Sequence, residues 1–468
     1  MTTYQDLLAV PEADKDRADF VRKVINEHKG SELYRTALDA DAYDRCRNST
    51  IMAHQNMVAL VTGQMVPDRW KANHKATSNF FNIFVTQLNQ YLLGNGVTWK
   101  EAQADKLFGN AFDTQLQKLG KLALIGGVSF GFWNLDRLIP FSALEFAPLY
   151  DEENGALTAG VRFWQVDPSK PLRATLYELD GYTEFLWSSR TDGRINAAWG
   201  LIETGSWLQP KRAYKLKVRE SEADGAEIYA GENYPAFPII PLYGNDHKQS
   251  ELVGIKEKID AYDLILNGFE NDLDNAQIYW IIKGAGGMED PDLMQFLDRL
   301  RVVGAAAPGD GQDVTPVTVD IPYDAREKLL DRLEKQLYKD AMIMNPNDLA
   351  SSAATATQIR AAYERQNSKA DMYEYCVLDF LRNLMALTGI EDKPTFTRSM
   401  IVNTQEEIQS LVMAASYLES SYVTRKILNL LGDGDQADEI LAQMDADDAE
   451  RLGSAGTEEE EAGNEETA

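Results

Sequence analysis

The sequence predicts an α+β fold, and three regions with different periodicities indicate it. Residues 1–125 have the spacing of helices separated by polar turns. Residues 128–245 alternate apolar and polar side chains and contain three hairpin-type dipeptides, which is typical of an antiparallel, meander-like sheet. After Ser250 the chain is predicted to form mainly long amphipathic helices.

The first region contains two helices with clear ends. The stretch SNFFNIFVTQLNQYLLGNG predicts a helix whose C-terminus lies at Gly94 or Gly96, because glycine accepts a positive φ there. A second helix is predicted in LFGNAFDTQLQKLGKLALIGG, which also stops at glycines. The apolar face of the first helix consists of Phe81, Phe84, Val85, Leu88 and Leu92.

The second region begins with the strand pattern VSFGFWN, in which Val128, Phe130 and Phe132 alternate with smaller or polar residues. Asp180-Gly181 lies between RATLYEL and YTEFLWS and predicts a hairpin turn at that dipeptide. The other two hairpin dipeptides are Asn154-Gly155 and Asp192-Gly193, and an extended exit segment is predicted at Pro235, Pro238 and Pro241.

A helix is predicted from Ser250 to Gln277, with Ser250 as its N-cap and a length of about 40 Å at 1.5 Å per residue. It has one narrow apolar seam with alternating spacings of three and four residues. Its other faces are rich in acids and amides, which predicts a solvated or channel-facing surface. The seam consists of Leu252, Ile255, Ile259, Tyr262, Leu266, Phe269, Leu273 and Ala276.

The rest of the chain alternates short inserts with helices. Residues 278–322 are predicted to form a strand, a short helix, a loop and a second strand. A long helix is predicted after Pro322, then a polar loop in NPNDLASSAATAT, another long helix, a strand in PTFTRSMIV and short helices from Thr404, Ser421 and Asp435. The two long helices have apolar faces at Leu330, Leu333, Leu337, Ala341 and Met344, and at Ala370, Tyr373, Val377, Phe380, Leu384 and Leu387.

Charge is the unusual property of this 468-residue chain, because 46 Lys and Arg face 74 Asp and Glu, for a net charge of −28. A chain this acidic is not expected to hold nucleic acid by neutralising phosphates. Cys46 and Cys376 imply no disulfide framework and suit a reducing compartment. No signal pattern or membrane-spanning run is expected, and the acidic tail 445–468 is predicted to be disordered.

No motif indicates catalysis, a cofactor or a metal. The chain has no GxxxxGK[ST] loop, and GAGG at 284–287 lacks the spacing of a dinucleotide-binding loop. The four histidines fall in separate segments without ligand spacing. Glu270, Asp272 and Asp274 are the best candidates for a Mg²⁺ site, but on a helix Asp272 points away from the other two.

The order of these parts resembles the portal proteins of tailed double-stranded DNA bacteriophages, of the siphophage type. Three stretches carry the resemblance, which covers roughly residues 34–442: NQYLLGNGVTW, FPIIPLYGND followed by SELVGIKEKIDAYDLILNGFENDLDNA, and YVTRKILNLLGDGDQADEILAQM. No single motif is diagnostic, so the resemblance rests on these segments and their order together.

The resemblance implies a portal fold. Residues 1–249 would form a mixed α/β wing, 250–277 and 323–344 two stem helices, and 278–322 a small α/β clip. Residues 345–402 would form a tunnel loop, a long helix and a returning wing strand, 403–444 a helical crown, and 445–468 the acidic tail.

The resemblance also implies a function without catalysis. Portal proteins form a ring, typically of twelve subunits, at one vertex of the capsid of the virion, after synthesis in the host cytoplasm. The ring is the channel for genome packaging and ejection, with transient passage of double-stranded DNA. Its implied partners are the terminase large subunit, a head-completion or adaptor protein, and the major capsid and scaffolding proteins, and no membrane is implied.

Residue roles follow only from the resemblance. The stem interface would consist of Ile255, Ile259, Tyr262, Leu266, Phe269 and Leu273. The tunnel loop touching DNA would use Asn345, Asn347, Asp348, Ser351, Ser352 and Thr355, and the clip contact with terminase or adaptor would use Lys283, Met288, Arg299 and Arg301.

Two other classes of protein remain open. A metal-dependent nuclease or hydrolase would need convergent carboxylates, and a capsid scaffolding protein would not need the β-rich region 128–245.

Overall fold

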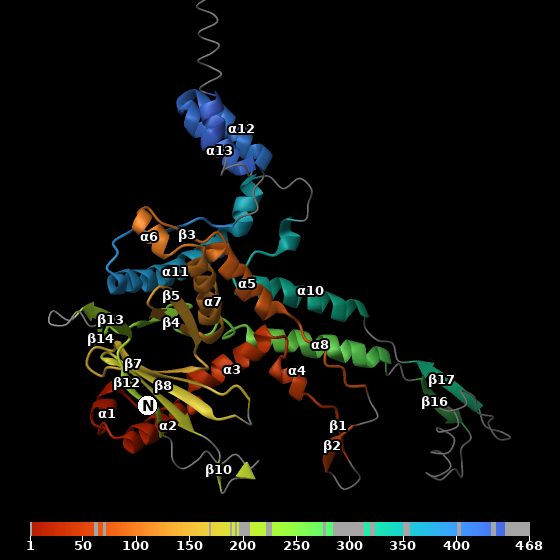
Figure 1. Cartoon of the computed structure of the whole chain (residues 1–468). Coiled ribbons are helices and arrows are strands. Elements are labelled where there is room, and N and C mark those ends of the chain that lie inside the picture. The colour runs from red at the N-terminus through yellow and green to blue at the C-terminus, as the bar shows by residue number, and fades with distance from the viewer. Residues whose placement is uncertain are drawn as a thin grey trace, which may run out of the picture. The chain divides into compact units, whose positions relative to one another are not determined.

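The computed structural model describes residues 2–59, 64–68, 72–167, 170–187, 190–191, 194–195, 206–220, 227–274, 278–283, 313–318, 323–349, 356–399, 404–431 and 437–444 (Figure 1). The chain divides into two compact units, which are described separately. The first contains Met1–Ile343 and Lys369–Arg398, and the second contains Met344–Ser368 and Ser399–Ala468.

The described part of the N-terminal region is mainly helical, as predicted, apart from two short strand elements. The two predicted helices are α5, Phe80–Leu93, and α7, Asn110–Gly126. Gly96 has a φ of +74° just after α5, and Gly127 caps α7 at +82°. The other helices are α1 (Tyr4–Leu8), α2 (Asp14–Gly30), α3 (Glu32–Asp44), α4 (Ser49–Ala53) and α6 (Ala102–Leu107). The strand elements are β3, Val97–Thr98, and a short hairpin of β1, Met57–Ala59, and β2, Met65–Pro67, which the sequence analysis missed.

The larger sheet of the first unit is the predicted antiparallel meander. Its strand order is β12-β9-β8-β7-β6, so four consecutive strands lie side by side. Helix α2 packs against it through Phe20, Val21, Val24 and Ile25, which join Val161, Phe163, Leu176 and Phe185 in one buried cluster. The strands are β6 (Phe146–Tyr150), β7 (Leu157–Trp164), β8 (Leu172–Glu178), β9 (Gly181–Trp187) and β12 (Ser206–Arg212).

The smaller sheet has the order β15-β4-β5 and includes the predicted strand VSFGFWN as β4, Val128–Asn134. Its neighbours are β5, Arg137–Ser142, and the edge strand β15, Ile239–Tyr243. Proline has no backbone N–H to donate, and Pro241 is tolerated in β15 because one side of an edge strand has no neighbouring strand to bond. The Phe130 ring of β4 lies 4.5 Å from the Phe146 ring of β6, so the two sheets share one core.

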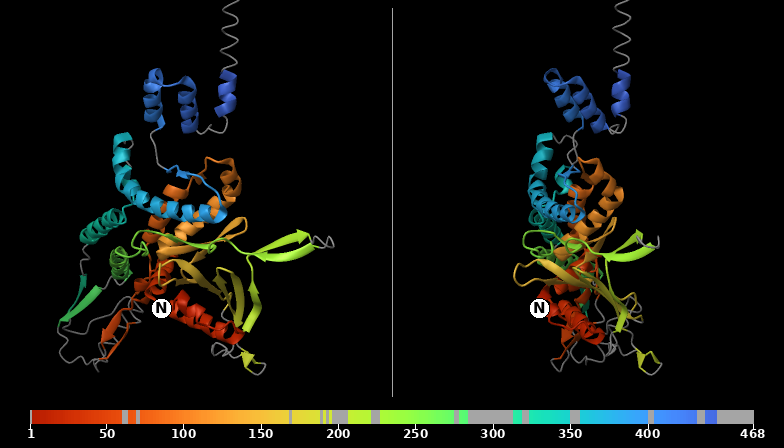
Figure 2. Two further views of the ribbon diagram at one scale, coloured as in Figure 1. Left: turned by 90° about the vertical axis from the view of Figure 1, so that its left-hand side faces the viewer. Right: turned by 60° about the vertical axis from the view of Figure 1, so that its left-hand side comes forward.

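The hairpin predictions hold with one correction. Glu178 pairs with Gly181, so the turn consists of Leu179 and Asp180, one residue earlier than predicted. Gly181 has a φ of +144° at the start of β9, which explains why glycine stands there rather than inside the turn. Strands β10 (Arg190–Thr191) and β11 (Arg194–Ile195) pair around Asp192-Gly193, which itself lies outside the described residues. A further ribbon, β13 (Lys215–Glu220) with β14 (Glu227–Glu232), projects from the sheets (Figure 2).

The long helix after Ser250 is shorter than predicted. It is α8, Lys256–Asp274, because Gly254 has a left-handed φ of +89° that an α-helix does not contain. The Ser250 hydroxyl accepts a bond from the Leu252 N–H at 3.1 Å, so it caps a turn before the helix.

Helix α8 is followed by a ribbon and a second helix. Strand β16, Ile278–Lys283, pairs antiparallel with β17, Asp313–Thr318. These are the two strands that were predicted for the insert. Its predicted short helix lies outside the described residues. The next helix, α10, spans Tyr323–Asp340 and ends four residues before the predicted Met344. Met342 has a φ of +56°, which is incompatible with a continuing helix.

Helix α11, Ala356–Thr388, is the predicted third long helix, and its second part belongs to the first unit. All six predicted face residues are buried, with exposed fractions between 0% at Val377 and 6% at Leu387. The Tyr373 hydroxyl lies 3.2 Å from the Asn89 side-chain oxygen of α5, which ties the two helices together. The predicted strand PTFTRSMIV is limited to β18, Thr395–Phe396, which pairs with β3, Val97–Thr98.

The second unit contains the predicted short helices. They are α12, Thr404–Ala414, α13, Ser420–Leu431, and a helical stretch at residues 437–444. The Arg425 guanidinium lies 2.6 Å from the Asp438 carboxylate, so α13 and the last stretch are linked. The acidic tail lies outside the described residues.

Two glycines near α8 give a paired prediction. A Cβ added at Gly254 or at Gly268 would meet no atom within 4 Å, so only the backbone distinguishes them. Gly254→Ala should destabilise the protein by about 1 kcal/mol because of its positive φ. Gly268→Ala, inside α8, should stabilise it by about 1 kcal/mol. Thermal unfolding of both variants checks this, and shifts of the same sign would contradict the observed start of α8.

Candidate functional site

Helix α8 is the predicted functional element, and the face that it buries in the chain is polar. Ile259, Asp263, Asn267 and Asn271 are the buried residues of α8, and they recur every four positions. Residues four apart share one face of a helix. The prediction that the acids and amides of this helix are solvated or channel-facing is therefore wrong for this face.

The partner of this face is an extended segment, residues 73–78, which we call the strap. The backbone N–H groups of His74, Ala76 and Ser78 donate to the side chains of Asn271 (2.8 Å), Asn267 (2.7 Å) and Asp263 (2.9 Å), respectively. Two residues of extended chain cover about 6.6 Å, and four residues of helix rise 6.0 Å. The matching repeats allow side chains of α8 to replace the hydrogen bonds of a neighbouring strand.

Further side-chain bonds extend this polar ladder at both ends. The Asn48 amide donates to Asp263 at 2.5 Å, and the Thr50 hydroxyl donates to Asp260 at 2.7 Å. The Tyr43 hydroxyl also donates to Asp260. At the other end, His74 Nε2 lies 2.5 Å from the Asp274 carboxylate. The N-terminal helices and the strap are thereby fixed to α8 over its whole length.

Asp263 is the electrostatic centre of the ladder. Its side chain is 0% exposed, and burial raises the pKa of its carboxyl, while the bonds from Asn48 and Ser78 oppose that rise. A carboxylate removed from water needs hydrogen-bond donors, and the strap supplies one from its backbone. The ladder is a structural network rather than a surface open to a ligand.

The apolar seam of α8 packs partly within the same chain. Tyr262 meets the Phe80 ring edge-on at 5.0 Å, and Phe269 meets the Tyr323 ring of α10 edge-on at 5.5 Å. Ile255 and Ile259 are buried, Leu266 is half-buried and Leu273 is 44% exposed. A contact of these residues with a neighbouring subunit stays a prediction.

Helices α8 and α10 lie side by side and antiparallel. The Arg326 guanidinium of α10 lies 2.6 Å from the Asp272 carboxylate, and Lys258 pairs with Asp340 at the opposite end. Asp272 and Asp274 therefore pair with different neighbours, as expected from their helix positions. Among the described residues, no three His, Cys, Asp or Glu side chains gather as a metal site would require. No helix in the described part of the chain is long and apolar enough to cross a membrane.

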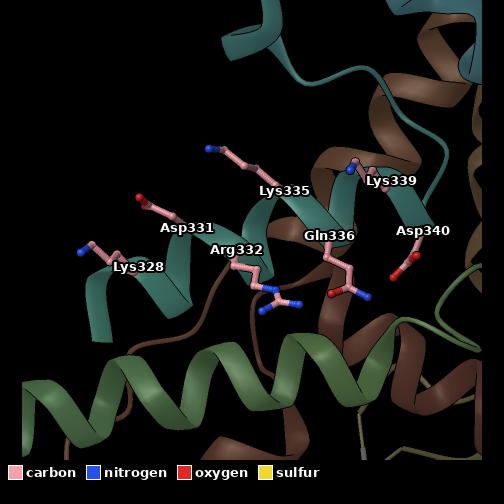
Figure 3. Close-up of a pocket in the computed structure, with 7 residues that line it drawn as sticks. All are labelled: Lys328, Asp331, Arg332, Lys335, Gln336, Lys339 and Asp340. Carbon is pink, nitrogen blue, oxygen red and sulfur yellow. The ribbon is translucent and has the colours of Figure 1, made fainter. Parts of the chain in front are cut away.

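Helix α10 carries an exposed basic stripe that the sequence analysis did not recognise. Lys328, Arg332, Lys335 and Lys339 recur at spacings of four and three, which places them on one side of the helix. They line an open groove of about 590 Å³ with Asp331, Gln336 and Asp340. In Figure 3, Lys335 and Lys339 point away from α8, whereas Arg332 and Gln336 point toward it. The stripe is a cationic surface in an otherwise acidic chain.

The structure describes only part of the other predicted sites. Asn345 precedes a 3-10 turn at Pro346–Leu349, and its side chain accepts a bond from the Asn347 N–H at 3.0 Å. Asp348 lies within that turn, and Lys283 is the last residue of β16. The remaining predicted residues lie outside the described ranges: Ser351, Ser352, Thr355, Met288, Arg299 and Arg301.

Comparison with known proteins gives a consistent result. The model of a family described as phage portal protein, SPP1 Gp6-like, matches residues 48–451. The portal protein of Bacillus phage SPP1 is 26% identical over 424 residues, which cover 85% of this chain and 80% of that protein. The portal protein of Clostridium phage phiCD119 is 23% identical over 209 residues, 42% of this chain and 46% of the relative.

Solved structures with a similar chain include two necks of a gene transfer agent particle. The neck of the native particle, computed with C12 symmetry, has a chain that is 12% identical with a TM-score of 0.40, and the match covers 74% of this chain and 89% of that one. The neck of the empty particle, computed with C6 symmetry, gives 12% identity and a TM-score of 0.41, with 75% and 90% covered.

Proposed function

The chain belongs to the SPP1 Gp6-like family of phage portal proteins, and from this premise we propose that it forms a closed dodecameric ring at one vertex of the capsid. The ring is the channel through which the genome enters during packaging and leaves during ejection. It also docks the terminase and later holds the adaptor that joins head and tail. The protein contributes a rigid conduit to these steps rather than a chemical reaction.

The observation that carries the proposal is the construction of the α8–α10 pair. One face of α8 is fixed to the body by the polar ladder, and another packs on α10. Leu264, on a further face, is 36% exposed, and Leu273, at the end of the seam, is 44% exposed. A helix pair held on two sides and open on the third suits packing against a neighbouring copy in a ring.

The charge pattern supports the same arrangement. The basic stripe of α10 can face the acidic surface of a neighbouring copy, since each chain has a net charge of −28. Such complementary contacts between different surfaces close into a ring when the rotation between copies allows it. The acidity of the whole assembly disfavours tight phosphate binding, so DNA is expected to slide through.

We assign the parts of the chain accordingly. The β16–β17 ribbon would belong to a clip at 278–322 that contacts terminase and then adaptor, and the turn after Met344 would begin a tunnel loop near passing DNA. Helices α12 and α13 would form the crown, and residues 1–249 the wing. The major capsid and scaffolding proteins would surround the wing during head assembly in the host cytoplasm.

Negative-stain electron microscopy with native mass measurement tests the proposal. We expect rings with a central hole and a mass near twelve times 52.4 kDa, for the protein alone or co-expressed with the capsid and scaffolding proteins of its phage. Monomers in both preparations would contradict the ring. Cleavage of DNA in a Mg²⁺-dependent assay would instead favour the nuclease alternative.

A further inference from the structure

The β1–β2 hairpin is an uncharged projection on a highly charged chain. No Asp, Glu, Lys or Arg occurs between Arg47 and Asp68, although charged residues make up 26% of the sequence. Met57 is 46% exposed and Met65 is 55% exposed. The hairpin projects beyond α4 and α8 (Figure 1), and within the described chain no third strand pairs with it.

The base of the hairpin is held firmly. The Asp68 N–H donates to the Asn56 carbonyl at 2.7 Å, and the Asn56 amide donates to the Ala72 carbonyl at 2.8 Å. Lys75, which follows the hairpin in the chain, donates from its ammonium to the carbonyl of Ile51, which precedes the hairpin, at 2.8 Å. The strap then begins, so the polar ladder fixes the chain immediately after the hairpin to α8. The projection therefore leaves the body in a defined direction.

Such a projection is poorly explained as a feature of an isolated subunit. A two-stranded hairpin is at best marginally stable alone, and both of its edges offer unpaired backbone groups. Exposed methionines on a rigid support are typical of an adaptable contact surface. A base fixed before binding lowers the entropy lost when a partner covers the hairpin.

The absence of charge favours one partner, a second copy of this chain. Two copies with a net charge of −28 each repel one another, so contacts between them that do not pair opposite charges should use surfaces without acids. An arm on one copy and a receiving surface on the next make the unlike contacts that closed rings need. Nucleic acid is a poor partner, because the hairpin has no cation for phosphates.

We propose that the β1–β2 hairpin is an arm that docks on the adjacent copy in the ring and that the polar ladder sets its direction. This inference rests on the proposed ring. It adds a contact outside the helix pair α8–α10, made by Met57, Met65 and the edges of the two strands.

Photo-crosslinking in assembled full-length rings tests the arm directly. The probe p-benzoylphenylalanine replaces Met65, and a control chain carries it at Leu135, which is 56% exposed on the β4–β5 turn. We expect irradiation to join copies of the chain into dimers and higher multimers from position 65, at least fivefold more than from position 135. A crosslink to another virion protein, or none, would overturn the arm.

A substitution test separates this inference from the ring itself. Met57→Glu with Met65→Glu places acids on an arm that meets an acidic neighbour, so the ring fraction should fall at least tenfold. Met57→Leu with Met65→Leu should keep it, and circular dichroism checks that both chains fold. Rings from the Glu variant would overturn the arm and leave the ring standing, whereas a wild-type chain that never forms rings would overturn both.

Discussion

Asn267→Ala is expected to destabilise the first unit by about 2 kcal/mol, because it leaves the half-buried backbone N–H and carbonyl of Ala76 without these partners. The Asn267 side chain accepts from the Ala76 N–H and donates to the Ala76 carbonyl, both at 2.7 Å, and is 2% exposed. Each buried polar group that loses its partner costs roughly 1–3 kcal/mol. Thermal unfolding measures the loss, and hydrogen exchange should accelerate at the amides of residues 74–78.

The control is Gln336→Ala, which removes a similar amide from an exposed position on α10. It should change the stability by less than about 0.5 kcal/mol, since exposed side chains away from special contacts contribute little. Equal effects of the two substitutions, or unchanged exchange in the strap, would mean that the ladder does not hold residues 73–78 to α8.

The elements that the sequence predicted best are those whose apolar residues determine their packing. The six face residues of α11 are all buried. Apolar residues at spacings of three and four lie on one face of a helix, and that face packs against the core. The strand VSFGFWN was also predicted, but it is buried on both faces, including Ser129 and Trp133. Alternation alone does not reveal that a second layer covers the other face.

The ladder was not predictable from the same signal. Asp263, Asn267 and Asn271 have the spacing of one helix face, and in a sequence that face is indistinguishable from a solvated one. Its partner strap has no periodic pattern and lies far away in the chain. Only the contact between the two segments shows that these polar side chains accept hydrogen bonds from the half-buried backbone of the strap.

Local backbone geometry explains the errors at element ends. The predicted start of α8 at Ser250 gave too little weight to Gly254, whose positive φ breaks the helix. The turn was predicted at Asp180-Gly181 because Asp-Gly is a favoured dipeptide inside hairpin turns. In the structure the turn is Leu179–Asp180, and Gly181 is the first residue of β9. The tunnel-loop and clip residues stay predictions, because no periodicity or motif fixes loop positions.

Phe269→Asp is expected to abolish ring assembly while the monomer stays folded. In one chain, Phe269 contacts Tyr323 at 5.5 Å, and the Arg326 guanidinium lies 5.9 Å from its ring. Loss of the aromatic pair should cost about 1 kcal/mol beyond the lost apolar burial, and Arg326 can pair with the new carboxylate. In the ring, a charge within the packed seam would lack such compensation on the neighbouring copy, so the ring fraction should fall more than tenfold.

Phe269→Leu is the matched control and should keep the rings, because it retains an apolar side chain in the seam. Native mass and electron microscopy give the ring fraction, and circular dichroism confirms that each variant folds. Rings from Phe269→Asp would show that the seam packs only within the chain. If Leu264→Asp then prevents assembly, the interface lies on the opposite, exposed face of α8, where Leu264 is 36% exposed. The two substitutions together therefore identify which face of α8 meets the adjacent copy.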